Sequence, residues 1–171
     1  DGTMFFADVT ASTIDYGGTK CLLGIFRDVT ERKRAEESLR KSEARFKNLF
    51  DNSPVGVFLL KDRKFADVNP ALCEITGFSR EEIIGQSVEI GYKDTEEFER
   101  VGKFIYEEVE KNGIGIANAR LKRKNGDLFD AMLYLSLVDA EDPSLGFQCI
   151  LIDITERMQV EESLRYSEEK F

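Results

Sequence analysis

Residues 69–85 read NPALCEITGFSREEIIG, and this stretch indicates two short helices in succession. Asparagine followed by proline is a common helix start, because the asparagine side chain caps the first turn and proline fits the first helical position. The glycine of ITG ends that helix, and the spacing S-x-x-E at residues 79–82 is a capping box for the next one, which stops at Gly85. Helices this short need a larger structure to pack on.

Strand-like segments lie on both sides of this stretch. Downstream, Asp94 starts a longer amphipathic helix that ends at Asn112-Gly113, and Lys124-Asn125-Gly126 is a strong hairpin signal. The order of two strands, several helices and three strands predicts an α+β domain with a mostly antiparallel sheet. The predicted strands are residues 55–61, 65–68, 114–122, 128–138 and 145–152.

An internal repeat sets the expected domain boundaries. Residues 28–46, DVTERKRAEESLRKSEARF, and residues 153–171, DITERMQVEESLRYSEEKF, are identical at twelve of nineteen positions. One repeat unit is therefore a globular part followed by a charged helical connector. The predicted organisation is the C-terminal strand hairpin of a preceding unit at 1–28, a helical connector at 29–47, a complete domain at 45–157 and the start of the next connector at 158–171.

The connector has the spacing of a coiled-coil seam. Its less polar residues recur in steps of four and three, which is heptad spacing, and the second copy repeats the pattern. An amphipathic helix resting on its own domain is one interpretation, and a short, weak parallel coiled coil between two chains is the favoured one. The seam residues are Ala35, Leu39, Ser42, Phe46 and Leu49, and then Val160, Leu164, Ser167 and Phe171.

The chain resembles the PAS family in several motifs: SPVGVFLL, NPALCEITGFSREEIIG, RKNG, and DITER with its earlier copy DVTER. The resemblance covers residues 45–157. It implies a five-stranded antiparallel sheet with short helices over one face, curled around a pocket and flanked by connector helices. It also implies a sensory, signal-relay and dimerisation module, without catalytic residues, that drives a separate output domain such as a kinase or a cyclase.

The residues expected to face such a pocket are mostly bulky and apolar. They can pack together as an ordinary core, or they can surround a small apolar ligand such as a lipid-like acid or an aromatic metabolite; both alternatives stay open. A lone polar residue, Asn118, is expected to orient a ligand. The candidate pocket residues are Phe58, Leu60, Leu72, Ile75, Phe98, Val101, Ile105, Asn118, Leu133 and Leu151.

Cofactor chemistry is restricted by missing residue types. The resemblance to the flavin-binding branch places a reactive cysteine just after Gly85, where this chain reads Gly-Gln-Ser-Val, and flavin-bonding amides at Leu121, Ala131 and Leu151. We therefore argue against a photoactive flavin. The chain has no histidine, which argues against histidine-ligated haem, histidine zinc sites and histidine-dependent nucleophiles. No cofactor or metal is required; a weaker flavin or an open haem site stays possible.

The DITER motif is expected to join the last strand rigidly to the outgoing helix. Asp153 can accept a hydrogen bond from the amide of Thr155 or Glu156, and it can pair with Arg157 four residues on. The sequence fits a plain helix cap as well as a signal-transfer junction, and the resemblance favours the junction. The predicted junction residues are Asp153, Thr155, Glu156 and Arg157, with Asp28, Thr30 and Arg32 in the earlier copy.

Net charge and cysteine content restrict the classes of partner and the cellular location that we expect. The net charge of −9 disfavours nucleic acid and anionic membranes, and paired glutamates on helices indicate solvation rather than catalysis. Three isolated cysteines and the absence of long apolar runs predict a cytoplasmic protein without disulfides. The outward side chains Val57, Leu59, Ile150 and Ile152 are apolar as well, so we expect the connector or a second protomer to cover them, and hence a homodimer.

Overall fold

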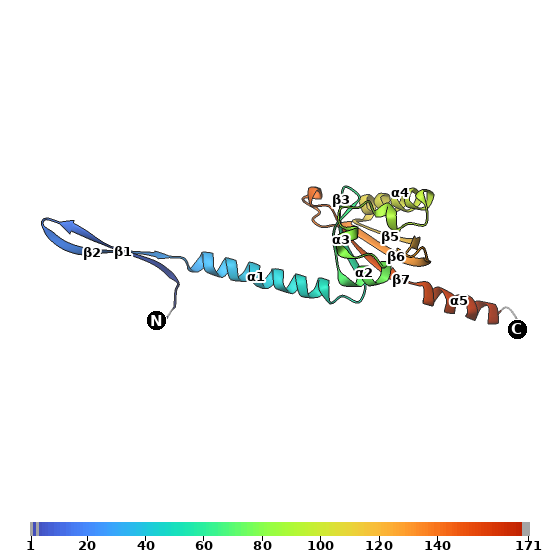
Figure 1. The fold of residues 1–171 in the computed structure, drawn as a ribbon, viewed down its shortest axis with the longest axis horizontal. Coiled ribbons are helices and arrows are strands. Elements are labelled where there is room, and N and C mark those ends of the chain that lie inside the picture. Colours follow the sequence, from blue (N-terminus) through green and yellow to red (C-terminus); the bar gives the residue numbers. More distant parts are fainter. Residues whose placement is uncertain (1, 3, 169–171) are drawn as a thin grey trace. The chain divides into compact units, whose positions relative to one another are not determined.

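The structure is a computed structural model that describes residues 2 and 4–168 of the chain (Figure 1). It divides into two compact units, Asp1–Asn48 and Leu49–Phe171. The larger unit holds the sheet and the short helices, and the smaller one holds a hairpin and most of a long helix. Within the described residues no helix is both long enough and apolar enough to span a bilayer.

The larger unit is built on a five-stranded antiparallel sheet, which confirms the predicted fold class. The strand order is β4-β3-β7-β6-β5. The last strand in the sequence, β7, therefore lies at the centre of the sheet, between the β3-β4 pair and the β5-β6 hairpin. This placement puts the start of the outgoing helix beside the middle of the sheet. The strands are β3 (Gly56–Lys61), β4 (Lys64–Val68), β5 (Ile114–Lys122), β6 (Leu128–Leu137) and β7 (Phe147–Asp153).

The helices between β4 and β5 gather on one face of the sheet (Figure 1). The predicted starts are confirmed: the Asn69 side chain accepts from the Leu72 amide at 3.0 Å, and Ser79 and Glu82 form the reciprocal capping box. A short 3-10 helix after Gly85 was not predicted. The helical elements are α2 (Pro70–Thr76), α3 (Arg80–Ile83), η1 (Val88–Gly91), α4 (Thr95–Asn112), η2 (Pro143–Leu145) and α5 (Thr155–Glu168).

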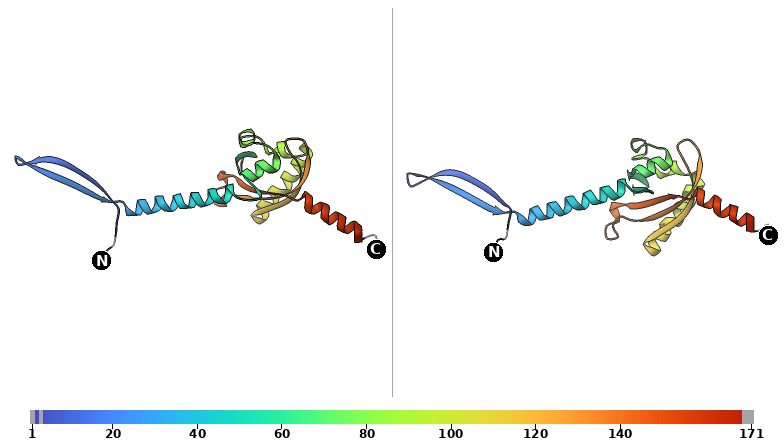
Figure 2. Two further views of the ribbon diagram at one scale, coloured as in Figure 1. Left: turned by 60° about the horizontal axis from the view of Figure 1, so that its bottom comes forward. Right: turned by 90° about the horizontal axis from the view of Figure 1, so that it is seen from below.

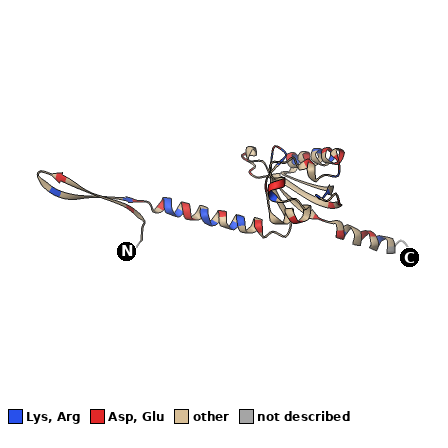
Figure 3. Cartoon of the chain, in the orientation of Figure 1, with Lys and Arg blue, Asp and Glu red and all other residues tan. Residues whose placement is uncertain are grey.

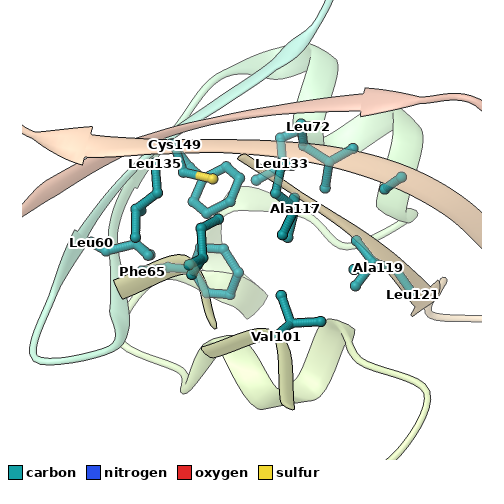
Figure 4. Packing of buried hydrophobic residues seen from close by; sticks show 14 of the residues in the cluster. Leu60, Phe65, Leu72, Val101, Ala117, Ala119, Leu121, Leu133, Leu135 and Cys149 are labelled. Atoms are coloured by element: carbon teal, nitrogen blue, oxygen red, sulfur yellow. The ribbon is translucent and has the colours of Figure 1, made fainter. Parts of the chain in front are cut away.

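The hydrophobic core lies between the sheet and these helices (Figure 4). Along β6 the residues Phe129, Ala131, Leu133 and Leu135 are buried, while the residues between them are half-buried. From the opposite side, Val101 of α4 points toward the strands and has no exposed surface. Burial on both sides anchors α4 to the sheet.

Asn69 connects three elements of this unit. Its side-chain oxygen accepts from the amides of Val57 at 2.9 Å and Leu72 at 3.0 Å, and its side-chain nitrogen donates to the carbonyls of Phe50 and Val55, both at 3.0 Å. The side chain is fully buried, and these four bonds satisfy both its oxygen lone pairs and both its amide hydrogens. One residue therefore holds the end of α1, the start of β3 and the start of α2 together.

The smaller unit begins with a two-stranded antiparallel hairpin of β1 (Ala7–Tyr16) and β2 (Thr19–Asp28). Gly17 and Gly18 have positive φ angles of 61° and 82°, which the tight turn requires. Helix α1 (Thr30–Asp51) follows and has side chains of both signs of charge along its length (Figure 3). Its many Glu, Lys and Arg residues favour the helix and keep its surface solvated.

Candidate functional site

An apolar cavity of about 60 Å³ lies between the inner face of the sheet and the helices. Its walls come from β3 to β7 and from α2, α3, η1 and α4. Most of the predicted pocket residues surround it. Those in its wall are Phe58, Leu60, Leu72, Phe98, Ile105, Leu133 and Leu151.

Three predicted pocket residues lie elsewhere. Val101 is buried in the core beside the cavity, and Ile75 packs against the core from α2. The prediction for Asn118 is wrong, because its side chain is exposed. Successive residues of a strand face opposite sides, and in β5 the buried positions are Ala117 and Ala119, so Asn118 faces outward.

No pattern in the sequence indicated the polar groups at this cavity. Tyr92 is one of them, and burial raises the pKa of its hydroxyl. Cys149 is another, and burial likewise raises the pKa of its thiol, which keeps it protonated and unreactive. The Thr76 hydroxyl is turned toward its own helix and donates to the Leu72 carbonyl at 2.8 Å. The cavity is thus apolar with a few weakly polar groups.

Arg63 is the one charged residue among the cavity walls that the structure describes. Its guanidinium carbon lies 4.0 Å from the ring centre of Phe98 and 5.8 Å from that of Tyr106. The Nε atom is buried and has no hydrogen-bond partner among the described residues. The nearest carboxylate is that of Glu99, 3.9 Å from Nη1. This guanidinium is held mainly by aromatic faces.

The cavity does not fit a flavin or a haem. Leu121, Ala131 and Leu151 are buried and apolar, so they offer no amide to a flavin ring. Ligand sites for molecules of that size measure roughly 300–1,000 Å³, well above the volume here. Among the described residues no group of three or more acidic or cysteine side chains is placed to hold a metal ion.

The second part of the candidate site is the junction between β7 and α5 (Figure 2). The Thr155 amide donates to the Asp153 carboxylate at 3.0 Å, as expected for a cap. The Thr155 hydroxyl accepts from the Asp130 amide at 3.1 Å, and the Ile154 amide donates to the Asp130 carbonyl at 2.9 Å. The first residues of the helix are therefore bonded to β6 as well as to β7.

The predicted pair between Asp153 and Arg157 is wrong. Arg157 bonds to Glu161 at 2.8 Å, and Asp153 bonds to Arg123 at 2.5 Å. The i,i+4 spacing brings side chains together only within a helix, and α5 begins at Thr155, after Asp153. Glu156, also predicted to belong to the junction, is exposed in the first turn.

Arg123 connects the junction to the wall of the cavity. It comes from the turn between β5 and β6, and its guanidinium donates both to the Asp153 carboxylate and to the carbonyl of Ile75 in α2. It also lies 4.1 Å from the ring centre of Phe129. The next residue adds a second link, because the Lys124 amide donates to the carbonyl of Thr76 at 2.8 Å.

Asp153 stays ionised at this position. Burial alone would raise the pKa of Asp153, but hydrogen bonds from the Thr155 amide and hydroxyl and from Arg123 outweigh burial and hold the pKa below its usual value. The charge of Arg123 adds to this effect. The carboxylate is therefore available to both partners throughout the neutral range.

The earlier copy of the motif forms the same hydrogen bonds. The Thr30 amide donates to Asp28 at 2.9 Å, the Thr30 hydroxyl accepts from the Phe6 amide at 2.9 Å, and the Val29 amide donates to the Phe6 carbonyl at 2.9 Å. The hydrogen bonds from Thr30 hold the pKa of Asp28 below its usual value. The repeat in sequence is thus a repeat in structure.

Arg32 and the predicted seam residues lie on α1. Arg32 pairs with Asp8 at 3.5 Å and with Glu36 at 3.6 Å. The seam side chains are exposed: 61% of Leu39 and 67% of Leu49 are accessible, and Ala35 and Phe46 are exposed as well. In the second copy, Val160 and Leu164 on α5 are also exposed. The seam predictions for the side chain of Ser167 and for Phe171 lie outside the described residues.

The outer face of the sheet is apolar and partly open. Ile150 is 39% exposed, while Val57, Leu59 and Ile152 are half-buried. The outward residues of β5 continue this face, with Ile116 exposed. The described residues thus leave apolar surface on the side of the sheet opposite the cavity.

Comparisons with known proteins agree with this architecture. The profile of the PAS domain matches residues 54–156. The chain is 29% identical over 122 residues to the sensor protein TdiS of Thauera aromatica, which covers 71% of this chain and 22% of TdiS. It is 28% identical over 158 residues to sporulation kinase E of Bacillus subtilis, which covers 85% of this chain and 19% of the kinase. The chain therefore spans about a fifth of the length of these relatives.

A solved structure with a similar fold is the PAS domain, in complex with ethanol, of a LuxR-family transcriptional regulator from Burkholderia thailandensis. It is 29% identical, with a TM-score of 0.59, and the alignment covers 64% of this chain and 96% of that one.

Proposed function

Since this chain belongs to the PAS domain family, a family of sensory signalling modules, we propose that it relays changes in the domain core to a connector helix. The observation that carries this proposal is the position of Arg123, which bonds to Ile75 in α2, the helix that supplies Leu72 and Thr76 to the cavity wall, and to Asp153 just before α5. A shift of α2 would pull on Arg123 and thereby on the junction.

The interactions at the junction are weak enough to be rearranged, as a switch requires. Each cap or pair at the junction is worth about 0.5–2 kcal/mol, so the helix can be re-aimed without unfolding the domain. The Thr155 bonds to β6 fix the direction of the first turn. The same bonds around Thr30 support the interpretation that residues 1–28 end a preceding PAS unit and that α1 is its outgoing connector.

We further propose that two chains associate through their connector helices. Heptad spacing and the exposure of Leu39 support a parallel coiled coil, and the open apolar face around Ile150 supports additional contact between protomers. The seam contains alanine and serine, so the association should be weak and adjustable. A weak dimer can change its packing when the junction moves.

The whole protein would place this module beside further PAS units and an output domain. The relatives include a sensor protein and a kinase much longer than this chain, which supports an output enzyme outside these residues and a non-catalytic role for the module itself. Three free cysteines support a cytoplasmic location, and the net charge of −9 supports partners other than nucleic acid or membrane surface.

The test is Asp153→Ala in the full-length protein. We expect a folded domain by circular dichroism and loss of the response of the output to its stimulus. Asp142→Ala is the matched control, because Asp142 also accepts a backbone hydrogen bond at a helix start, from Ser144, but it precedes β7, whose other end forms the junction. A normal response in Asp153→Ala would remove the junction from the mechanism.

A second candidate role is sensing of a small ligand in the cavity. The observation in its favour is an apolar space of about 60 Å³ between the sheet and the helices, with a charged residue at its wall. The related PAS domain in complex with ethanol supports a ligand of few atoms. A titration with n-butanol tests whether the cavity admits a small molecule. Binding is measured by nuclear magnetic resonance as changes in the chemical shifts of the Leu60 and Leu133 amides.

A further inference from the structure

Arg63 has an unusual backbone for a charged residue. It follows Asp62 in the turn between β3 and β4, and the two residues have positive φ angles of 59° and 52°. Residues other than glycine, asparagine and aspartate are uncommon in this region. The turn directs the Arg63 side chain along the end of the sheet to the wall of the cavity.

Helix α4 is shaped to receive this side chain. Phe98, Gly102 and Tyr106 are spaced four residues apart, so they lie on one face of the helix. The two rings lie near the guanidinium, and a Cβ atom at Gly102 would come so close to Arg63 Nη2 that the guanidinium would have to shift. Glycine in the interior of a helix is unfavourable, so its presence here is explained by the room that Arg63 needs.

The hydrogen-bonding capacity of this guanidinium is incompletely used. Nε is buried without a partner among the described residues, and the only carboxylate near the group, that of Glu99, is 3.9 Å from Nη1 and largely exposed. Buried donors in proteins are normally satisfied, and an arginine donates best to a planar carboxylate. The remaining walls that the structure describes carry no acidic side chain.

We propose that the cavity binds a short-chain monocarboxylate, whose apolar tail enters the space between sheet and helices and whose carboxylate accepts from Arg63. This inference rests on the second proposed role, ligand sensing. The Arg63 side chain is 40% accessible, so the headgroup would lie at the mouth of the cavity with the tail inside. The ligand leaves by the same route.

The volume selects the length of the tail. A cavity of about 150 Å³ holds benzene in another protein, and a water molecule occupies about 30 Å³ of liquid. The present 60 Å³ therefore admits about two or three carbon atoms, as in propionate and butyrate. Affinity should rise about fourfold for each added methylene and stop rising once the space is filled.

The test is a titration of the isotope-labelled chain, followed by nuclear magnetic resonance at constant ionic strength. The probes are acetate, propionate, butyrate and hexanoate, with n-butanol as a neutral probe of butyrate size. We expect butyrate to bind about tenfold more tightly than n-butanol and to shift the Arg63 Nε–H resonance, because a charge-assisted hydrogen bond replaces a neutral one.

Arg63→Gln and Arg63→Met should remove the preference for the acid, so that butyrate and n-butanol bind each variant with about equal affinity. Arg100→Met is the matched control, since Arg100 lies on α4, the helix against which Arg63 packs, pairs with Glu97 and is not in the cavity wall. If butyrate and n-butanol bind the wild type equally, the carboxylate assignment is wrong although ligand sensing stands. If none of the probes binds, both are wrong. If only one of the two Arg63 variants folds, the binding measured with that variant decides the test.

Discussion

The bond between Arg123 and Asp153 can be measured directly by a double-mutant cycle. The perturbations are Arg123→Met, Asp153→Asn and both together. Asparagine keeps the oxygen that caps the Thr155 amide, and methionine keeps an apolar stem over the Phe129 ring, so the cycle isolates the ion pair. The two side chains are only 28% and 29% exposed, so water screens their attraction less than at an open surface.

The expected magnitude follows from this partial burial. A hydrogen bond to a charged group contributes about 1.5–3 kcal/mol, and part of it is replaced by water in the variants, so we expect a coupling free energy of about 1–2 kcal/mol. Asp67 and Arg80 provide a control pair that is 34% and 53% exposed, for which about 0.2–1 kcal/mol is expected.

The assay is urea unfolding of the chain, followed by far-ultraviolet circular dichroism because the sequence has no tryptophan. Hydrogen exchange supplies a second measurement: Arg123→Met should speed exchange of the Thr155 amide more than that of amides within α4. A coupling free energy below about 0.3 kcal/mol, with exchange at Thr155 unchanged, would refute the idea that Arg123 links the cavity wall to the junction.

Three further outcomes are expected. Asn69→Ala should lower the free energy of unfolding by about 3–5 kcal/mol in urea melts, because it removes four hydrogen bonds between a fully buried side chain and backbone groups at buried or half-buried positions; a loss under about 1 kcal/mol would contradict the bonding described. Leu39→Asp should reduce the mass seen by light scattering at micromolar concentration, whereas Ala44→Asp, on the opposite face of the heptad, should not; equal masses would argue against the seam. The fold lowers the pKa of Asp153, so the contribution of its carboxylate to stability is present above about pH 4 and is lost as pH falls through the folded pKa. The wild type should therefore lose more stability than Asp153→Asn between neutral pH and about pH 3. Parallel pH profiles of the two proteins would disprove this.

Local patterns in the sequence were sufficient to predict the α-helices and strands of the larger unit and their order. The caps at Asn69 and Ser79 and the hairpin before Leu128 depend on residues a few positions apart, and they are confirmed. The repeat of DVTER and DITER likewise predicted that one kind of strand-to-helix junction occurs twice, and the cap of each aspartate on its threonine amide was expected from spacing alone.

The partners across the domain were decided only by the tertiary structure. Arg123 meets Ile75 over 48 positions of sequence and Asp153 over 30, and no periodicity of the chain encodes such a meeting. Arg63 reads in the sequence as an ordinary turn residue, and its role at the cavity depends on how a left-handed turn and a glycine in α4 are packed together. Short-range propensity acts within a few residues, whereas burial and charge pairing act between whatever surfaces the fold brings into contact.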